Sequence, residues 1–385
     1  MLRPRLIVLQ PTAYCNINCS YCYLSHRDDR RLMPMAVIDG VREKIFRKLA
    51  PDAAPSVVWH AGEPTMAPIE WYDDAYARLI DVSPPNTSFA MQSNGLAIDG
   101  KWIDFFRRTR TDVGLSIDGP RRFHDARRRT RNNKPTWQLA VRALERLQDA
   151  GFYPNVISVL HPDGLKCPDE YYDFYRQHGI TRVNFSIDEL EGANLNCSFG
   201  DKDYKQALMD FVVALLEQAY REDFPLHIIE VERIAQILTS NSLPPQNEQV
   251  APWDIIVVAA DGSLSTFSPE FMEIRSPMHG DFVFGNILTG DIEDFNDDEV
   301  LQKTCAEIAA GVAACRSSCK YFGVCGGGAP VNKLCEKQTL TATETMFCRL
   351  SVQALADALM TFLTNQQANQ PPGSALQSRT GYPTA

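Results

Sequence analysis

The sequence predicts an α/β fold in which a partial (β/α)6 barrel is followed by a smaller, cysteine-rich domain. Strand-like apolar runs alternate with helical patterns through the first two thirds of the chain, and such alternation implies a parallel sheet covered by helices. Six such units are fewer than the eight of a closed barrel, so we expect an open or partial one. The 385 residues, of which 44% are hydrophobic, can bury a core of that size.

The six expected strands are short, apolar runs, and a helical pattern follows each of them. They cover Leu6–Leu9, Val57–His60, Phe89–Gln92, Val113–Ile117, Val156–Leu160 and Val183–Ile187. Val37 and Val41 begin a four-residue apolar repeat, as on one face of a helix. Thr136 is the expected N-cap of a later helix, and Gly151 is its expected end. Residues 204–220 form the long, largely apolar helix expected after the last strand.

The pattern changes after residue 240, where Pro244-Pro245-Gln246-Asn247 looks like a linker. Asp254–Ala260 followed by Asp261-Gly262 predicts a strand that enters a hairpin turn. Residues 305–348 are expected to be irregular, because Gly326-Gly327-Gly328 disfavours regular structure.

The end of the chain is expected to contain one helix and a tail. The helix runs from about Thr345 to Leu363, and residues 365–385, rich in Gln, Asn, Pro and Gly, are expected to be disordered. We therefore divide the chain into a barrel domain (1–240), a cysteine-rich domain with a C-terminal helix (241–364) and a disordered tail (365–385).

Composition narrows the classes of function. The formal net charge of −10 argues against a general nucleic-acid binder, and no apolar run is long enough to span a membrane. The first ten residues are too briefly apolar for a secretory signal. Eleven cysteines without such a signal indicate a reducing, cytoplasmic location and favour metal binding over disulfides.

Three cysteines follow the first expected strand in the pattern Cys15-x3-Cys19-x2-Cys22. In a parallel barrel, ligands gather at the C-terminal ends of the strands. Three thiolates on one loop can bind three irons of a [4Fe–4S] cluster and leave the fourth iron open for S-adenosylmethionine (SAM). A zinc site or three unrelated thiols are the alternatives, but no fourth ligand for zinc lies nearby in the sequence. The pattern, with Tyr21 before its last cysteine, resembles the signature of the radical SAM superfamily.

Motifs at the ends of the next three strands extend that resemblance. Gly62-Glu63-Pro64 resembles the superfamily's GEP motif, whose carboxylate can accept hydrogen bonds from the SAM ammonium while glycine allows close approach. Ser93-Asn94-Gly95 resembles its TNG turn. Ser116 and Asp118 end the fourth strand and are expected to reach the ribose hydroxyls. A turn-capping role is the alternative for these residues.

A strongly basic run spans Arg121 to Arg131. Most of it is expected to form a solvated face, but it also resembles the HDxxR segment of sulfatase-maturase relatives. That match implies that Arg128 pairs with the SAM carboxylate in the bidentate way that arginine favours. The remaining arginines are candidates to hold an acidic peptide segment.

The cysteines near the end of the chain carry a second resemblance. Cys315-x3-Cys319-x5-Cys325, followed by Cys348, resembles the SPASM extension found on radical SAM enzymes that modify peptides and proteins. The resemblance implies that these four residues hold one auxiliary [4Fe–4S] cluster. A zinc site that only braces the fold is the alternative.

Two departures from the SPASM pattern limit the carry-over. The first spacing is one residue longer than in the family, so Cys305 or Cys335 is an alternative to Cys315 as a ligand. Relatives with a further auxiliary cluster have a cysteine three residues after Cys325, where this chain has Ala329, and others around the hairpin, where it has none. We therefore expect two clusters in total.

Longer strings narrow the resemblance further. Gln10–Cys15, Ser265–Glu270, Tyr321–Lys333 and Thr343–Thr345 look like those of the cyclophane-forming peptide maturases, nearest the Gly-rich-repeat (GrrM-like) branch. The resemblance implies a partial TIM-type radical SAM barrel with a C-terminal SPASM-type domain. It implies a ribosomal precursor peptide as substrate, in which an aromatic ring carbon is joined to the β-carbon of the residue two places on. We expect a flavodoxin- or ferredoxin-type protein as electron donor.

Such a reaction needs a base for the proton that leaves the ring. Glu270 is the first candidate, because its segment replaces the cysteine strand of the missing cluster, and Asp254 is the second. A surface or capping role is the alternative for Glu270. Only fourteen residues precede Cys15, so we expect no N-terminal leader-binding domain. Two other functions stay open: a thioether- or formylglycine-forming maturase, and a non-catalytic iron–sulfur electron carrier, which would leave the SAM motifs unexplained.

Overall fold

The computed structural model describes residues 1–200, 202–240 and 247–368. Its barrel is built on parallel strands, namely β1 (Leu6–Leu9), β2 (Ser56–Trp59), β3 (Ser88–Ser93), β4 (Thr111–Ser116), β5 (Asn155–Leu160), β6 (Arg182–Ile187) and β7 (His227–Ile228). All six predicted strands are present, and their ends lie within two residues of the predicted ones. The two-residue β7 was not predicted, since it is too short to show any apolar alternation.

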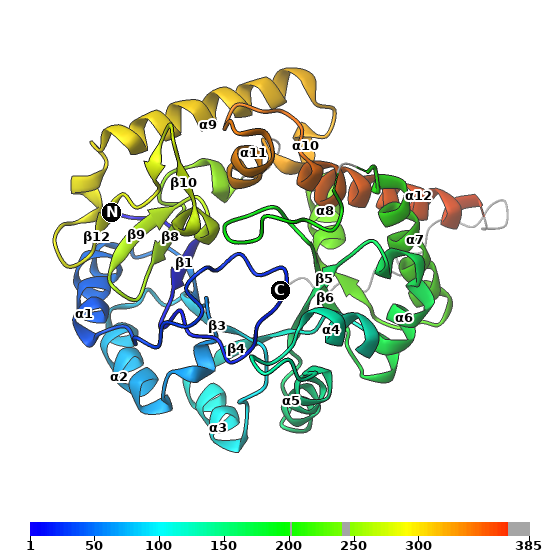
Figure 1. Cartoon of the computed structure of the whole chain (residues 1–385), viewed down its shortest axis with the longest axis horizontal. Helices are drawn as coiled ribbons and strands as arrows, with labels where there is room; N and C mark the ends of the chain where they lie inside the picture. The colour runs from blue at the N-terminus through cyan, green and yellow to red at the C-terminus, as the bar shows by residue number, and fades with distance from the viewer. Residues whose placement is uncertain (201, 241–246, 369–385) are drawn as a thin grey trace.

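Helices cover the outside of this curved sheet (Figure 1). They are α1 (Met35–Lys44), α2 (Ile69–Leu79), α3 (Gly100–Thr109), α4 (Arg121–Arg127), α5 (Trp137–Asp149), α6 (Pro168–Gln177), α7 (Lys205–Arg221) and α8 (Ile229–Thr239). The helix predicted between Thr136 and Gly151 is confirmed, because α5 begins after Thr136 and Gly151 follows its end with a φ of 85°. The hydroxyl of Thr136, however, makes no capping bond and donates instead to Arg128 O at 2.6 Å.

The register brings the functional loops to one edge of the sheet. Ile7 of β1 pairs with Val57 of β2, and Val57 pairs with Phe89 of β3, all in parallel. Strands in such a register run in one direction, so the loops after them open at the same end of the barrel. In Figure 1 the loop after β1 lies across the middle of the barrel mouth.

The second part of the chain extends the same sheet. In the described residues one sheet has the order β12-β9-β8-β1-β2-β3-β4-β5-β6-β7, with β8 (Ile255–Val258) parallel to β1 and β9 (Ser263–Thr266) antiparallel to β8. The predicted hairpin is therefore confirmed, and Gly262 occupies its turn with a φ of 87°. The short β12 (Gly285–Asn286) pairs with β9, while β10 (Arg275–Ser276) and β11 (Gly280–Asp281) form a separate pair.

The cysteine-rich stretch differs from the expectation of irregular structure. It is mostly helical, with α9 (Glu299–Ser318), α10 (Phe322–Cys325) and α11 (Pro330–Lys337). Asp298 starts α9 by accepting a hydrogen bond from Leu301 N at 2.8 Å. The three glycines do break the helices, since all have positive φ, but they confine the irregularity to residues 326–328.

The last helical segment begins with a π-helical stretch, Cys348–Ala354, and continues as α12 (Leu355–Ala368). The predicted helix is present and is five residues longer than expected, so residues 365–368 of the predicted tail are helical. The rest of that tail (369–385) and residues 244–246 of the predicted linker lie outside the described residues.

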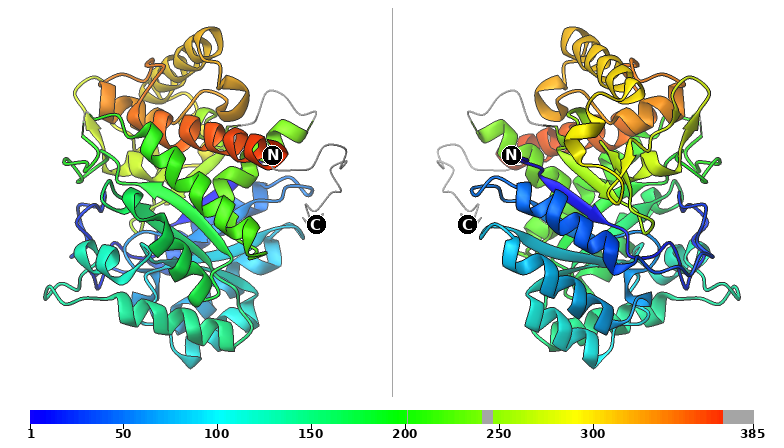
Figure 2. Two further views of the ribbon diagram at one scale, coloured as in Figure 1. Left: turned by 90° about the vertical axis from the view of Figure 1, so that its right-hand side faces the viewer. Right: turned by 90° about the vertical axis from the view of Figure 1, so that its left-hand side faces the viewer.

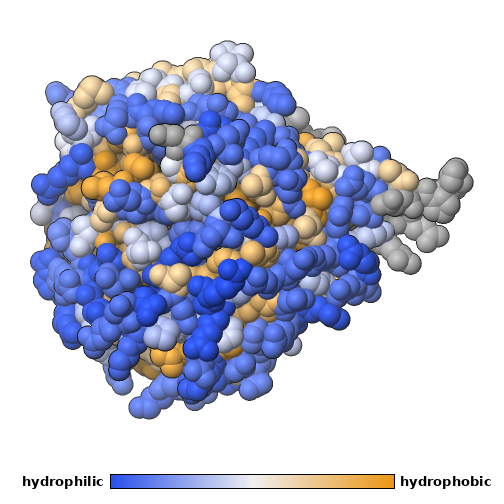
Figure 3. Space-filling view, turned by 45° about the vertical axis from the view of Figure 1, so that its right-hand side comes forward, coloured by the Kyte–Doolittle hydropathy of each residue, from blue (hydrophilic) through white to orange (hydrophobic). Residues whose placement is uncertain are grey.

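The helices after β12 gather on one side of the barrel (Figures 1 and 2). On the face shown in Figure 3, hydrophilic side chains predominate and apolar ones form small separate patches. Within the described ranges, no helix combines the length and the apolar character that a membrane crossing requires.

Candidate active site

The loop after β1 carries three free thiols, those of Cys15, Cys19 and Cys22. Burial raises the pKa of the Cys15 thiol to about 12, and the nearby charges of Glu63, Cys19 and Cys22 raise it further. Burial also raises the pKa of Cys19 to about 11, and Cys22 contributes to that shift. The three sulfurs are thus close enough to repel one another as thiolates, so they would need cations between them to ionise together.

The basic segment after α4 holds this loop in place. Arg131 Nε donates to Cys15 O at 2.7 Å, and Asn18 N donates to Arg129 O at 2.7 Å. The other arginines of the run form ion pairs inside the chain, Arg121 with Asp125, Arg122 with Glu170 and Arg127 with Asp163. The expectation that they hold an acidic peptide segment is therefore corrected, because their partners are acidic residues of this chain.

Gly62 allows the loop after β2 to approach the cysteine loop. It has a φ of 54°, and a Cβ built on it would lie 2.6 Å from both Thr12 O and Tyr14 O. Glu63 N also donates to Tyr14 O at 2.8 Å. A residue with a side chain would push the two loops apart, which explains glycine at this position.

Glu63 connects the ends of β2 and β3. It is 1% exposed, and its carboxylate accepts hydrogen bonds from Ser93 Oγ at 2.7 Å, from Asn94 N at 2.7 Å and from Thr65 N at 3.1 Å. Burial raises its pKa, although these donors favour the charged form. The next residue, Pro64, accepts a hydrogen bond from Tyr72 OH through its carbonyl at 2.9 Å. Glu63 therefore organises the mouth of the barrel in addition to its predicted contact with SAM, which stays a prediction.

Asn94 reaches the cysteine loop from the end of β3. Its Nδ2 donates to Asn16 Oδ1 at 2.8 Å and lies 3.9 Å from Cys15 Sγ. Ser116, at the end of β4, accepts a hydrogen bond from Gln92 Nε2 at 2.9 Å. Both predicted residues thus lie at the mouth.

Asp118 occupies a different place from the one predicted. Its side chain is 1% exposed and its carboxylate binds Arg128 Nε at 2.9 Å, Tyr21 OH at 2.6 Å and Val159 N at 3.2 Å. Burial opposes ionisation of Asp118, but Arg128 and His124 outweigh it and lower its pKa. A carboxylate enclosed in this way is not free to contact ribose hydroxyls, so its role is corrected to holding Tyr21 and Arg128 in position.

Arg128 in turn faces the cysteine loop. Its Nη1 lies 3.8 Å from Cys19 Sγ, and its guanidinium lies 5.5 Å from the centre of the Tyr21 ring. Asp118 binds only Nε, which leaves the outer nitrogens directed towards the cysteines. The predicted pairing of Arg128 with the SAM carboxylate stays a prediction that this geometry permits.

His161 was missed by the sequence analysis. It follows β5 directly, is 3% exposed, and its ring centre lies 5.4 Å from that of Tyr21. Its Nδ1 lies 3.0 Å from Ser198 Oγ and 3.5 Å from Asp188 Oδ2, while Nε2 is buried without a hydrogen-bond partner among the described residues. Its position after a strand end, like that of the predicted residues, was the signal that could have found it.

Four of the C-terminal cysteines form a second group. Burial raises the pKa of Cys325, and Cys319 and Cys315 raise it further. Burial also raises the pKa of Cys348 to about 11, with Cys325 and Cys319 contributing. The structure therefore brings together the four predicted ligands of the auxiliary cluster.

The two alternative ligands lie elsewhere. Burial alone raises the pKa of Cys305, and no thiol contributes to that shift. Burial raises the pKa of Cys335 to about 11, and its charged neighbours are Glu336, Glu189 and Glu270. Neither cysteine replaces Cys315 in the group.

Both cysteine sets fit a cluster of several irons. Among the residues that the structure describes, no three His, Cys, Asp or Glu side chains converge closely enough to ligate a single metal ion. The thiolates of a [4Fe–4S] cluster each bind a different iron, so they lie further apart than the ligands of one zinc ion. The three thiols of the N-terminal loop and the four of the second group have the number and spread that such clusters need.

Three buried carboxyl groups lie between these cysteine sets. Asn332 Nδ2 donates to Glu189 Oε2 at 2.6 Å and to Glu191 Oε1 at 3.0 Å. Burial raises the pKa of Glu189 to about 7, and Glu270 adds to this shift. Burial, followed by the charges of Glu189 and Glu270, raises the pKa of Glu191 well above its usual value. Tyr23 OH is buried near Glu270 without a hydrogen-bond partner in the described residues. We call Glu189, Glu191 and Glu270 the carboxyl group of the site.

Glu270 is therefore buried, and burial raises its pKa. The alternative of an exposed surface carboxylate does not apply to it. Asp254, the second candidate base, immediately precedes β8, whose first residue pairs with the first residue of β1. It thus lies at the end of the sheet opposite the cysteine loop, with Arg5 as its neighbour, and the prediction of a catalytic role for it is corrected.

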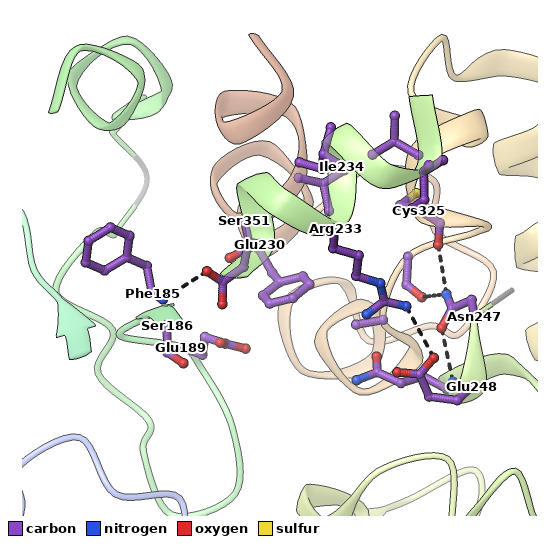
Figure 4. Close-up of a pocket in the computed structure, with 17 residues that line it drawn as sticks. Phe185, Ser186, Glu189, Glu230, Arg233, Ile234, Asn247, Glu248, Cys325 and Ser351 are labelled. Atoms are coloured by element: carbon purple, nitrogen blue, oxygen red, sulfur yellow. Dashed lines mark hydrogen bonds and ion pairs between the residues drawn. The ribbon is translucent and has the colours of Figure 1, made fainter. Parts of the chain in front are cut away.

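A cavity of about 280 Å³ lies beside the carboxyl group, between β6, α8 and the loop after Cys325 (Figure 4). Glu189 and Cys325 both line it. Asn247 Nδ2 donates to Cys325 O at 3.1 Å, and Arg233 pairs with Glu248 at 3.3 Å. The cavity therefore extends from the carboxyl group to the second cysteine set.

Comparisons with known proteins agree with this architecture. The sequence profile of the Radical SAM superfamily matches residues 9–166. The uncharacterized protein sll1766 of Synechocystis sp. is 32% identical over 361 residues, which cover 92% of this chain and 91% of that protein. A serine-type anaerobic sulfatase-maturating enzyme of Bacteroides thetaiotaomicron is 29% identical over 230 residues, which cover 55% of this chain and only 54% of that enzyme.

Solved structures share the fold at lower sequence identity. Native anSMEcpe with bound AdoMet has a TM-score of 0.75 and 18% identity, covering 95% of this chain and 100% of its own. Streptococcus suis SuiB bound to the precursor peptide SuiA has a TM-score of 0.63 and 17% identity, covering 88% of this chain and 74% of its own. Because the profile covers the barrel and the relative of 32% identity spans nearly the whole chain, the chain belongs to the radical SAM superfamily, whose cofactors are a [4Fe–4S] cluster and SAM.

Proposed function

We propose that the protein is a radical SAM peptide maturase that forms a carbon–carbon cross-link in a ribosomal precursor peptide. The bond joins an aromatic ring carbon of one residue to the β-carbon of the residue two positions on. The observation that carries this proposal is the buried carboxyl group, because it lies between the two cysteine sets and contains the residue predicted as the base. The peptide and sulfatase maturases among the similar proteins support a polypeptide substrate.

The proposed cross-link removes two hydrogens from the peptide. When bound, the N-terminal cluster and SAM supply a 5'-deoxyadenosyl radical that takes the β-hydrogen as an atom, and the auxiliary cluster supplies an acceptor for one electron. The second hydrogen leaves the ring as a proton, which Glu270 accepts. A carboxyl whose pKa burial has raised is suited to this step, because its affinity for the proton is higher than that of an exposed glutamate.

The neighbours of Glu270 support its assignment. Glu189 and Glu191 share its environment, and Asn332 fixes both of them through hydrogen bonds. Three carboxyl groups at such close quarters do not all ionise together, so the group can take up one proton without acquiring a net positive charge. We further propose that residues 1–240 form the catalytic barrel, that residues 241–364 form the auxiliary domain, and that a flavodoxin- or ferredoxin-type protein supplies the initiating electron.

The test uses reconstituted enzyme, SAM, a reductant and a synthetic peptide with an aromatic-x-x triplet. We expect 5'-deoxyadenosine and a peptide lighter by two hydrogens, with fragmentation locating the new bond between the ring and the β-carbon. Glu270→Gln should form 5'-deoxyadenosine but little cross-linked peptide, whereas Asp254→Asn should behave like the parent enzyme. Equal cross-linking by Glu270→Gln and the parent enzyme would rule out Glu270 as the base.

Formylglycine formation is a second candidate, and the similarity to sulfatase-maturating enzymes favours it. It would oxidise a Ser or Cys side chain to an aldehyde. A peptide that contains both the aromatic triplet and a Ser separates the two functions, because only the aldehyde reacts with a hydrazide probe. A hydrazide adduct without a ring cross-link would replace our proposal by this one.

A further inference from the structure

Lys333 is a buried cation beside the second cysteine set. It lies in α11 with only 3% of its surface exposed, and its Nζ donates to Cys315 Sγ at 3.5 Å. Within residues 1–200, 202–240 and 247–368, no carboxylate forms an ion pair with it. Lysine is almost never fully buried without a partner, because removing an ammonium from water is costly.

The fold leaves room for this side chain on two sides. A Cβ built on Gly311 of α9 would lie 3.2 Å from Lys333 Nζ, and one on Gly328 would lie 3.4 Å from Lys333 Cε. A Cβ on Gly311 would also approach Leu340 O to 2.4 Å. The lysine therefore extends between α9 and the glycine turn after Cys325, and its end reaches Cys315.

The position of the charge needs an anion. Four protonated thiols would offer the ammonium no opposite charge, whereas four thiolates on a [4Fe–4S] cluster carry a net negative charge. We propose that Lys333 is the counter-charge of the auxiliary cluster, which it holds through Cys315 and whose midpoint potential it raises. This inference rests on the auxiliary cluster of the proposed function.

The direction of the effect follows from electrostatics. Reduction adds one negative charge to the cluster, and a nearby ammonium in a medium of low dielectric constant stabilises that charge more than water would. A second donor, Gln353 Nε2, lies 3.5 Å from Cys348 Sγ, but it is a neutral amide. A higher potential makes the cluster a better acceptor for the electron that the substrate releases when its ring becomes aromatic again.

The contact also distinguishes between the candidate ligands. Cys315 has Lys333 as a hydrogen-bond donor and lies with the other thiols, whereas no thiol contributes to the pKa of Cys305. We therefore assign Cys315 as the ligand. Lys333 acts through that ligand and is a positioning residue, not a group that contacts the substrate.

The test measures iron content and the midpoint potentials of both clusters by EPR-monitored titration, in the reconstituted enzyme without peptide. Lys333→Met removes the charge, Lys333→Arg keeps it, and Lys337→Met removes an exposed lysine from the same helix as a matched control. We expect a lower potential of the auxiliary cluster in Lys333→Met alone. The potential of the N-terminal cluster should be unchanged in all three variants.

An unchanged auxiliary potential in an iron-replete Lys333→Met enzyme would overturn the proposal. If Lys333→Met loses the auxiliary iron, Lys333→Gln is measured, since it keeps a hydrogen-bond donor without the charge. Loss in both neutral variants with retention in Lys333→Arg supports the counter-charge, whereas loss in Lys333→Arg as well means that the side chain only packs. A normal potential shift in an enzyme that forms no cross-link would refute the proposed function and leave this inference intact.

Discussion

The pair of Asp118 and Arg128 offers a quantitative test of how the SAM site is built. Asp118→Asn keeps the size and shape of the side chain but leaves the guanidinium of Arg128 buried without its carboxylate. The side chains of Asp118 and Arg128 are 1% and 9% exposed, and Nε and Oδ1 are 2.9 Å apart. The substitution also weakens the acceptor for Tyr21 OH, which lies 2.6 Å from Oδ2.

Removing one partner of a buried ion pair typically costs about 3–5 kcal/mol, because the remaining charge stays desolvated. We expect Asp118→Asn to lower the free energy of unfolding by an amount in this range. The matched control is Asp163→Asn, because Asp163 pairs with Arg127 at 2.8 Å while 55% of its side chain is exposed. An exposed pair contributes about 0–1 kcal/mol, so the control should change stability little.

The assay is anaerobic urea unfolding of the reconstituted enzymes, followed by tryptophan fluorescence, with the iron content measured in parallel. The pKa of Asp118 is lowered in the folded state, so its stabilisation is present above the ordinary aspartate pKa of about 3.9 and is lost as the pH falls through the folded value. The difference between parent and variant should therefore shrink in acid. Equal, small effects of Asp118→Asn and Asp163→Asn at neutral pH would refute the idea that this buried pair supports the site.

Three further predictions concern glycine, pH and ligand identity. Gly62→Ala should destabilise the protein by about 1–3 kcal/mol and reduce iron binding at the N-terminal loop, because its φ is positive and a Cβ would strike two carbonyl groups, whereas Gly100→Ala has open space and should be neutral in urea unfolding. Burial raises the folded pKa of Glu189 to about 7, so its ionisation lowers stability as the pH rises from about 4.3 to 7; Glu189→Gln should therefore increase the free energy of unfolding more at pH 8 than at pH 5. Cys315→Ala should lose the auxiliary iron in a chemical iron assay and Cys305→Ala should keep it, and the reverse result would invalidate the ligand assignment.

The barrel could be predicted because its signals are local. Each strand from Leu6–Leu9 to Arg182–Ile187 is an apolar run, and parallel pairing then requires that the loops after the strands meet. The cysteine loop and Gly62 follow directly from this rule. The same rule points to His161 and Glu189, which come immediately or closely after β5 and β6, but no motif marked them.

The rest depends on contacts between distant parts of the chain. The carboxyl group combines residues from the loop after β6 with Glu270, and Asn332 comes from a helix that was expected to be a loop. The enclosure of Asp118 by Arg128 and Tyr21 is likewise a tertiary property, since a turn-ending Asp reads the same whether it is free or paired. Local pattern gives the direction in which a strand ends, but it does not give the partners that a side chain meets there.

Helix α11 links the two halves of the proposed chemistry. Asn332 holds Glu189 and Glu191, and the next residue, Lys333, contacts Cys315. Successive residues of an α-helix point about 100° apart, so one turn presents the amide to the carboxyl group and the ammonium to the auxiliary cysteines. A cross-link that releases a proton and an electron needs acceptors for both near the same ring carbon. One rigid helix turn that positions both acceptors would couple the two transfers, and this arrangement explains why Pro330 and the preceding glycines set the start of α11 so sharply.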